Sequence, residues 1–501
     1  MHKFWESITG FQRWPWILAG IIVCAALWTG VILKQDTYDD AFIIFRYAYN
    51  FATGQGFVYN LGARHLSITG PFYGLLLGIL GLLGPDSIPE IAGNLSMVSL
   101  VATGIALFRF GELHQQTFCG FLAGLFFVTH PLLIHTFGGE MHMQAALIAW
   151  AFVCYKAEKT VVSAVLLGAA LLVRPDALLA AGVIGVHYLI TRRRIPWREG
   201  LAMAIVVLPF AGLAWLYFGG ILPDTFSSRL AQRDSQLWIP FLTGLLEWIR
   251  AFTVGGSPIF HATPFPDTLR FAVFVGLGVP ALVFFRFWLL PLAWIGIYTT
   301  FYHLTGVPFY NWYLIPIVLG LSILMASGLA GSVEALTFLY ARLVNRQSAF
   351  PVKTIGSILA TGIIAISITA QIKHLQLLES REPNPVEKTY EAVGQWLQIN
   401  TPGDTSVGYF EIGYIGYYSR RTIIDPLGLV DPVIVPHVSQ GDFNWAYEHF
   451  RPDYILINRR IPNFGPDSDS AWFQTEYRQV EKIFIEGHVE LELYARNMDV
   501  Q

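Results

Sequence analysis

The sequence predicts a polytopic α-helical membrane protein that ends in a small α/β domain. Of its 501 residues, 54% are hydrophobic and only 13% are charged, and the mean hydropathy is +0.49. Soluble domains carry roughly 25% charged residues. The charge is also uneven, because residues 383–501 hold 17 acidic and 9 basic side chains whereas the rest of the chain holds 18 and 23. We therefore expect a membrane domain over residues 1–378 and a water-exposed domain over residues 379–501.

The first apolar run extends from Trp14 to Leu33 and is long enough to cross a bilayer. It follows Lys3 and Arg13 as in a signal peptide, but no cleavage site of small residues precedes Lys34. We therefore expect an uncleaved transmembrane helix. Ten further runs are long enough, or nearly so, to cross: 88–108, 118–136, 141–155, 161–173, 176–190, 200–218, 269–285, 287–303, 308–328 and 354–371.

A shorter, glycine-rich run from Pro71 to Leu83 decides the topology. If it also crossed, the basic segment Arg192 to Arg198 would lie outside, against the excess of Lys and Arg in cytoplasmic loops. We therefore expect a re-entrant or in-plane helix over 71–83 and about eleven transmembrane helices. This topology places the first loop (34–70), the large loop (219–268) and the C-terminal domain on the extracytoplasmic side of the cell membrane.

The C-terminal region alternates helix-like and strand-like patterns. Val386 to Leu397 is amphipathic, whereas Thr405 to Tyr409 and Tyr454 to Ile457 are short β-type runs. Turn residues separate these segments, so we expect a small α/β domain.

Composition also limits the kinds of site. Cys24, Cys119 and Cys154 all lie in apolar runs, which supports neither a disulfide framework nor a cysteine-based metal site. The histidines near residue 140 match no zinc-binding spacing. No basic cluster with interleaved aromatic residues occurs, so we expect no nucleic-acid partner.

Two adjacent carboxylates, Asp39 and Asp40, follow the first apolar run. A like-charged pair beside an apolar site raises at least one pKa or recruits a cation, which is the chemistry of a base or a metal site. Oxygen ligands of this kind suit Mg²⁺ or Mn²⁺. The alternative is that both residues stabilise the N-terminus of an amphipathic helix that begins near Thr37 and lies on the membrane.

The pair opens the motif Asp39-Asp40-Ala-Phe-Ile-x-Phe-Arg46-Tyr-Ala-x-Asn50, which continues to Asn60-x-Gly62 and Thr69-x-Pro71. This stretch resembles the first loop of GT-C glycosyltransferases, nearest to the mycobacterial terminal arabinofuranosyltransferase group. Five more segments are similar to family motifs and occur in the expected order: Gly138-Gly139-Glu140, Arg174-Pro175-Asp176, Leu222 to Arg229, and the tail segments Gly408 to Ser419 and Ile424 to Leu429.

The sequence also departs from the family pattern. Acidic residues that usually follow the Asn60 motif are replaced by Ala63 to Ser67, and Asp224 and Arg229 stand where the family has Asn and Lys. We therefore do not expect the arabinose specificity to carry over.

The resemblance implies an enzyme that transfers a sugar from a polyprenyl-phosphate donor to an extracytoplasmic glycan, lipid or protein of the cell envelope. Asp39 or Asp40 would be the base or a metal ligand, and Glu140 would orient the acceptor or share the cation. Arg174 and Arg229 would neutralise the lipid phosphate, since guanidinium groups match phosphate oxygens. The candidate substrate-binding residues are Arg46, Asn60, His303, Tyr310 and Trp312.

Each of these residues also has a structural interpretation. Arg174 could end a helix and pair with Asp176, Glu140 could stabilise a helix N-terminus, and Arg229 could extend to lipid headgroups. Tyr310 and Trp312 could belong to an aromatic belt at the bilayer interface.

Two other functional classes fit the composition. A transporter or flippase of lipid-linked sugars would also have many helices and membrane-embedded charges, but no inverted repeat is detectable. A membrane scaffold with a partner-binding C-terminal domain is the non-enzymatic alternative.

Overall fold

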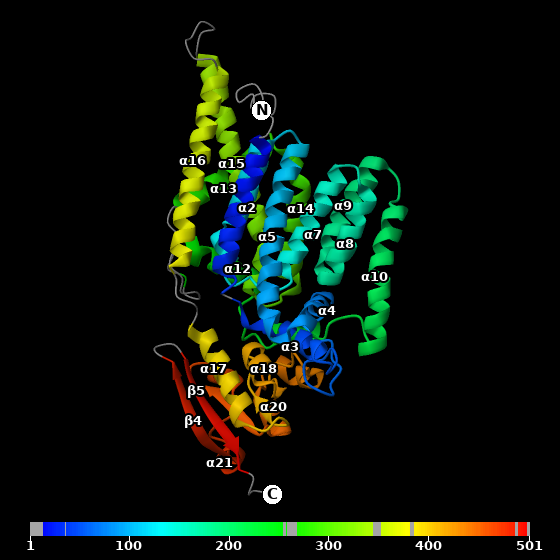
Figure 1. Ribbon diagram of the computed structural model, residues 1–501, viewed down its shortest axis with the longest axis vertical. Helices are drawn as coiled ribbons and strands as arrows, with labels where there is room; N and C mark the ends of the chain where they lie inside the picture. The colour runs from blue at the N-terminus through cyan, green and yellow to red at the C-terminus, as the bar shows by residue number, and fades with distance from the viewer. Residues whose placement is uncertain are drawn as a thin grey trace.

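The computed structural model describes residues 14–35, 37–253, 257, 268–343, 352–380, 385–485 and 489–497. A bundle of helices forms the larger part, and the C-terminal domain lies at one end of it (Figure 1). The bundle helices are α2 (Trp14–Leu33), α5 (Ile88–Leu113), α6 (Thr117–Val128), α7 (Met141–Lys156), α8 (Thr160–Val173), α9 (Leu178–Arg192), α10 (Trp197–Phe218), α12 (Phe241–Thr253), α13 (Thr268–Ala281), α14 (Leu289–Thr305), α15 (Leu314–Leu343) and α16 (Val352–Glu379).

The expected number of eleven transmembrane helices is not confirmed. Within the described ranges, four helices are long and apolar enough to cross a membrane: Pro15–Leu33, Pro85–Leu113, Trp197–Phe218 and Asn311–Tyr340. A fifth candidate is the pair Ala272–Ala281 and Arg286–Thr305, which meet at 100°. Other apolar helices are shorter because the helical conformation ends before the chain could cross the bilayer. The helix α8, for example, ends at Val173 because Pro175 holds Arg174 in an extended conformation.

The run 71–83 is a short helix, α4 (Pro71–Leu80), followed by a 3₁₀ turn to Leu83. It packs against α3 (Asp39–Ala52), which lies where the bundle meets the C-terminal domain (Figure 1). The predicted amphipathic helix near Thr37 is therefore present. Its setting differs from the expectation, because nine of its fourteen residues are buried instead of lying against lipid.

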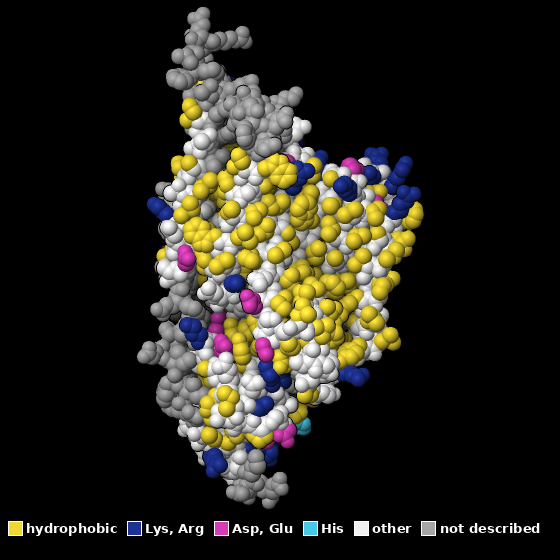
Figure 2. Space-filling model, viewed as in Figure 1, with side chains coloured by type: hydrophobic (Ala, Val, Ile, Leu, Met, Phe, Trp, Pro, Cys, Tyr) yellow, Lys and Arg dark blue, Asp and Glu magenta, His cyan; other side chains and the backbone are white. Residues whose placement is uncertain are grey.

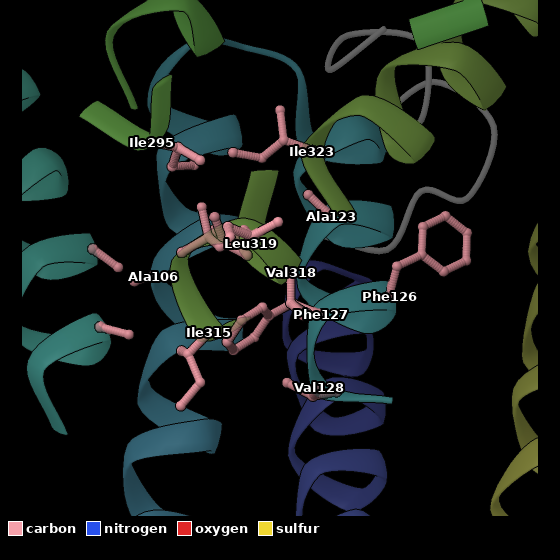
Figure 3. Close-up of a cluster of buried hydrophobic side chains, with 14 of the residues drawn as sticks. Ala106, Ala123, Phe126, Phe127, Val128, Ile295, Ile315, Val318, Leu319 and Ile323 are labelled. Atoms are coloured by element: carbon pink, nitrogen blue, oxygen red, sulfur yellow. The ribbon is translucent and has the colours of Figure 1, made fainter. Parts of the chain in front are cut away.

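The bundle core is formed where α5, α6, α14 and α15 meet (Figure 3). Phe127 of α6 and Val318 of α15 are fully buried there, beside Ala106 of α5. The outer surface of the bundle is rich in hydrophobic side chains (Figure 2), and on α10 Leu208 and Leu216 are both exposed. This exposure is typical of helices that face lipid.

The C-terminal domain contains a five-stranded mixed sheet with the order β2-β1-β3-β5-β4. The strands β2, β1 and β3 pair in parallel, with β2 at one edge of the sheet, and β5 and β4 are antiparallel additions at the other side. The predicted α/β character is therefore confirmed. The strands are β1 (Ser406–Gly408), β2 (Thr422–Ile424), β3 (Tyr454–Asn458), β4 (Tyr477–Ile485) and β5 (Val489–Arg496), and the helices are α17 (Pro385–Asn400), α18 (Gly413–Ser419), α19 (Val435–Ser439), α20 (Asn444–Phe450) and α21 (Ala471–Glu476).

Two loops of this domain face the bundle, and the parallel pairing of β1 and β2 explains why. Their carboxyl ends meet at one edge of the sheet, which is where open α/β sheets present functional loops. The loop after β1 leads into α18, which packs against α3. The loop after β2 packs against α11 (Thr225–Asp234), since Ser228 donates a hydrogen bond of 2.6 Å to the carbonyl oxygen of Gly428.

Glycines on α18 allow this helix to lie directly on α3. A Cβ atom at Gly413 would collide with the backbone carbonyl oxygen of Asp39, and one at Gly416 would collide with the hydroxyl group of Tyr59. The spacing of three residues places both glycines on one face of α18. The close approach therefore requires glycine at both positions.

We expect Gly413→Leu to separate the C-terminal domain from α3, because its side chain has no space between the two helices. The expected result is faster proteolysis of the region before α17 and a lower melting temperature. Gly403→Leu is the matched control, since no atom lies within 4 Å of a Cβ placed there. Equal protease resistance in both variants would contradict the proposed contact.

Candidate active site

A cavity of about 330 Å³ lies between the bundle and the C-terminal domain. Four of the predicted polar residues line it although they are far apart in the sequence: Asp40, Glu140, Arg174 and Arg229. The C-terminal domain contributes Leu429. Most of the remaining wall is apolar, and it includes Ile43, Ile44, Leu178, Leu179, Leu222, Phe226 and Phe301.

Asp40 and Arg229 form an ion pair on the wall of this cavity. The Nη2 atom of Arg229 lies 2.6 Å from Oδ2 of Asp40. The side chain of Arg229 is 13% exposed and that of Asp40 is 25% exposed. A second nitrogen of Arg229 donates to Gln232 at 3.0 Å, and the guanidinium lies 4.0 Å from the ring centre of Tyr310. Arg229 therefore does not extend to lipid headgroups. It is held as a partly accessible cation with one carboxylate partner.

Aromatic rings support this cation. Trp312 stacks on Tyr310 at 4.6 Å and on Tyr38 at 4.7 Å, and the hydroxyl group of Tyr310 donates to Gln232 at 2.9 Å. Trp312 lines the cavity, whereas Tyr310 lies behind Arg229 and contacts its guanidinium group. Both residues therefore belong to a packed cluster at the candidate site.

Asp39 points away from the cavity, toward the C-terminal domain. Its two carboxylate oxygens accept hydrogen bonds from the backbone N–H groups of Gly413 and Tyr414, at 2.8 and 2.9 Å. These are the first N–H groups of α18, which a helix cannot satisfy internally. Asp39 thus caps a helix, but the helix belongs to the other domain and not to α3.

Glu411, in the loop after β1, adds a third acidic group beside the aspartate pair. Burial and the neighbouring Asp39 and Asp40 carboxylates raise the pKa of Glu411 well above its ordinary value. Burial, together with Asp40, raises the pKa of Asp39 to about 7, although its two backbone hydrogen bonds act in the opposite direction. The expectation that at least one carboxylate of the pair has a raised pKa is therefore met by Asp39. Its like-charged neighbours are Asp40 from the bundle and Glu411 from the C-terminal domain.

Glu140 and Arg174 form a second, more deeply buried charge cluster. Glu140 precedes α7, and its Oε1 atom lies 2.5 Å from Nη1 of Arg174. Nη2 of Arg174 lies 3.2 Å from Oδ2 of Asp176, and the hydroxyl group of Tyr302 donates to the same oxygen at 2.5 Å. All three charged side chains are 4% to 6% exposed. Two carboxylates therefore share one guanidinium.

The glycines before Glu140 explain how its carboxylate reaches this position. A Cβ atom at Gly139 would collide with the hydroxyl group of Tyr38, so only glycine permits this approach. The pair of glycines ahead of an acidic residue is thus a packing requirement that positions Glu140 in the cavity wall.

Four of the five predicted substrate-binding residues do not line the cavity, and Tyr310 is one of them. The guanidinium of Arg46 donates to the backbone carbonyl oxygens of Tyr59, Gly416 and Arg421. Asn60 exchanges two hydrogen bonds with the backbone of Ile423, at 2.8 and 3.0 Å, and so extends the β2 edge. His303 is exposed on α14. Arg46 and Asn60 therefore join the first loop to the C-terminal domain.

Four further residues at the site were not predicted from the sequence: Glu411, Gln232, Tyr302 and Leu429. Glu411 and Leu429 lie within the family-like tail segments, but a linear motif does not show which of its residues face a distant loop. Gln232 follows Arg229 by three residues, a helical spacing that places the two side chains on one face of α11. That spacing was the available signal for Gln232.

The residues present do not fit a divalent cation held by Asp39 and Asp40. Both oxygens of Asp39 already accept backbone hydrogen bonds, and Asp40 is paired with Arg229. Within the described part of the chain, no group of three or more His, Cys, Asp or Glu side chains is arranged to hold a metal ion. The large loop 219–268 was expected to lie on the same side of the membrane as the site. Its residues 254–256 and 258–267 are outside the described residues.

Comparison with solved structures identifies proteins with the same architecture. The archaeal oligosaccharyltransferase AglB from Archaeoglobus fulgidus, in complex with an inhibitory peptide and a dolichol-phosphate, aligns with a TM-score of 0.59 and 13% identity over 98% of this chain and 75% of that one. ArnT from Cupriavidus metallidurans, bound to undecaprenyl phosphate, aligns with a TM-score of 0.56 and 13% identity over 98% and 99%. The chain therefore has a GT-C fold.

The narrower likeness to arabinofuranosyltransferases is not confirmed. AftD from Mycobacteria aligns with a TM-score of only 0.46, at 15% identity, and this chain covers 42% of it. No curated protein matches the sequence. Residues 378–498 match a family described as Domain of unknown function (DUF8728).

We expect the stability of the folded protein to fall as the pH rises. Burial raises the pKa of Asp425 to about 7, as it does for Asp39, so the folded state keeps protons that the unfolded chain releases near pH 4. Stability then falls between about pH 4 and 7. The melting temperature should be about 3 °C lower at pH 8 than at pH 5. Asp425→Asn should reduce this difference and the exposed Asp469→Asn should not; equal pH dependence in both variants would contradict the assignment.

Proposed function

We propose that this protein is an integral-membrane glycosyltransferase that transfers a sugar from a polyprenyl-phosphate donor to an extracytoplasmic glycan, lipid or protein. The observation that carries this proposal is the Asp40 and Arg229 pair on the wall of a largely apolar cavity. Transfer requires a group that removes a proton from an acceptor hydroxyl and a cation that neutralises the departing phosphate. The GT-C fold supports the proposal.

The chemical step needs only these two groups. The acceptor oxygen attacks the anomeric carbon of the sugar, and Asp40 takes the proton of the acceptor hydroxyl. The bond between that carbon and the phosphate oxygen breaks, and its electron pair leaves with the lipid phosphate. Arg229 stabilises the charge that develops on this phosphate. No step of the proposed reaction passes through a metal ion.

Charge balance favours Arg229 over Arg174 as the phosphate-binding residue. Arg174 is shared by Glu140 and Asp176, so its cluster has a net negative charge and would repel a phosphate. Arg229 has a single carboxylate partner and a more exposed guanidinium. We therefore assign Arg174 to the positioning of Glu140, which would orient the acceptor.

The ion pair between Asp40 and Arg229 in the free protein also suggests that the donor binds before Asp40 can act as the base. In the free protein, the Oδ2 atom of Asp40 accepts a hydrogen bond from Arg229 and is therefore less available to an acceptor hydroxyl group. A donor phosphate would attract the guanidinium and release the carboxylate. Asp40 would then become a competent base only once the donor is bound.

The membrane orientation is part of the proposal. Lys and Arg side chains gather at the end of the bundle opposite the C-terminal domain (Figure 2), as is typical of the cytoplasmic ends of membrane helices. The cavity and the C-terminal domain would then lie on the extracytoplasmic side.

The test is sugar transfer by the purified protein from polyprenyl-phosphate sugars to water or to added hydroxyl acceptors. We expect Arg229→Gln to lower kcat/KM for the donor about 100-fold, the size of effect seen when one charge-stabilising donor is removed. Arg233→Gln, on the same helix but exposed, is the matched control. Transport of lipid-linked sugar between leaflets without transfer would overturn the proposal in favour of a flippase.

A further inference from the structure

A second cavity of about 680 Å³ is lined by the ends of several bundle helices. These helix ends lie at the end of the bundle remote from the C-terminal domain (Figure 1). The cavity lies between the C-terminal ends of α5, α7 and α9 and the beginning of α14. We call it the distal pocket. Its lining residues are Phe110, His114, Tyr155, Lys156, Glu158, His187, Thr191, Arg192, Arg286, Phe287, Leu289, Leu290 and Ala293.

The charged residues of the distal pocket are mostly basic. Lys156, Arg192 and Arg286 line it, and they come from three separate segments. Glu158 is the single carboxylate of the lining, and it pairs with Arg192. Lys156 and Arg286 have no carboxylate partner within the described part of the chain. The pocket therefore has two uncompensated positive charges.

His114 adds a hydrogen-bonding group to the aromatic wall. Its ring stacks on Phe287 at 4.6 Å, and its Nε2 atom is buried without a hydrogen-bond partner among the described residues. Burial and the charge of Lys156 lower the pKa of His114 to about 4, so the ring is neutral at pH 7. A buried polar atom with no partner is costly, and a bound ligand would satisfy it.

We propose that the distal pocket binds the phosphate headgroup of an anionic phospholipid. Lys156 and Arg286 would contact the phosphate oxygens and His114 would donate to them, because these are the groups that recognise a phosphodiester. Basic pockets between the ends of membrane helices bind lipid headgroups in this way. Exposed apolar side chains beside the pocket, such as Ile190 and Leu289, provide a surface for the acyl chains and favour a lipid over a free phosphate.

The test uses the full-length protein in lipid nanodiscs of phosphatidylcholine, with and without phosphatidylglycerol. We expect phosphatidylglycerol to raise the melting temperature of the wild type by about 3 °C. The double variant Lys156→Gln/Arg286→Gln should lose this shift. Lys159→Gln/Arg194→Gln removes the same charge from exposed positions outside the pocket and should keep it.

Two results would overturn the proposal. The first is an equal shift in both double variants, which would indicate general charge attraction to the membrane. The second is the same shift from inorganic phosphate in phosphatidylcholine nanodiscs, which would assign the pocket to a soluble anion. A photoactivatable phosphatidylglycerol should also label wild-type peptides from α5, α7, α9 or α14, which line the pocket. Labelling confined to other helices would contradict the proposed site, and this measurement requires no variant.

Discussion

Asp40→Asn should lower the rate of sugar transfer about 1,000-fold, within the range that general-base removal produces. The asparagine would retain the size of the side chain and its contact with Arg229 but could not accept a proton. The measurement is single-turnover transfer from a polyprenyl-phosphate sugar at saturating donor. We expect donor binding to change far less than the rate, because Arg229 remains in place.

Asp39→Asn is the matched control, since it changes the adjacent carboxylate in the same way. Asp39 contacts α18 and not the cavity, so we expect a lower melting temperature and at most about a tenfold loss of rate. A larger loss of turnover in Asp39→Asn than in Asp40→Asn would reverse the assignment. Wild-type turnover in both variants would exclude a catalytic role for the pair.

Arg174→Gln should be the most destabilising single change at the site. It removes the shared partner of Glu140 and Asp176, which are 5% and 6% exposed, and leaves two like charges buried together. Breaking a buried ion pair by the removal of one partner typically costs about 3 to 5 kcal/mol. The measurement is the loss of folded protein on heating or in denaturant, followed in detergent.

A double variant that also neutralises Glu140 tests whether the loss of stability comes from the two carboxylates left buried together. Arg174→Gln/Glu140→Gln should recover part of the stability because only the Asp176 charge remains buried. Arg109→Gln, which breaks an exposed pair with Glu112, should cost less than about 1 kcal/mol. If Arg174→Gln cost no more than Arg109→Gln, the buried cluster would not have the structural role described here.

The C-terminal domain completes the candidate site. Its loop after β1 places Glu411 beside Asp39 and Asp40, and its loop after β2 places Leu429 in the cavity wall. The carboxylate of Asp425 holds the second loop through the N–H groups of Leu427, Leu429 and Val430, at 2.8, 2.5 and 3.2 Å. An isolated membrane domain would therefore lack part of the cavity wall and the helix that Asp39 caps.

Much of the architecture follows from local patterns in the sequence. Apolar runs predicted the helices, and alternating patterns predicted the α/β domain. The exact number of membrane crossings did not follow, because helices such as α6 and α8 stop partway where the chain turns toward the cavity. The length of an apolar run does not show where such an interruption falls.

Sequence alone determined the helical membrane class, the α/β tail and the polar residues Asp40, Glu140, Arg174 and Arg229 as candidates. Tertiary structure decided which of them share a cavity and what each contacts. Asp39 and Asp40 are adjacent, yet successive side chains on a helix point about 100° apart, so one faces α18 and the other faces Arg229. The contact between Asp40 and Arg229 joins residues 189 positions apart, and the contact between Asp39 and Gly413 joins residues 374 positions apart. Such contacts depend on how the helices and the two domains pack, and no local pattern contains that information.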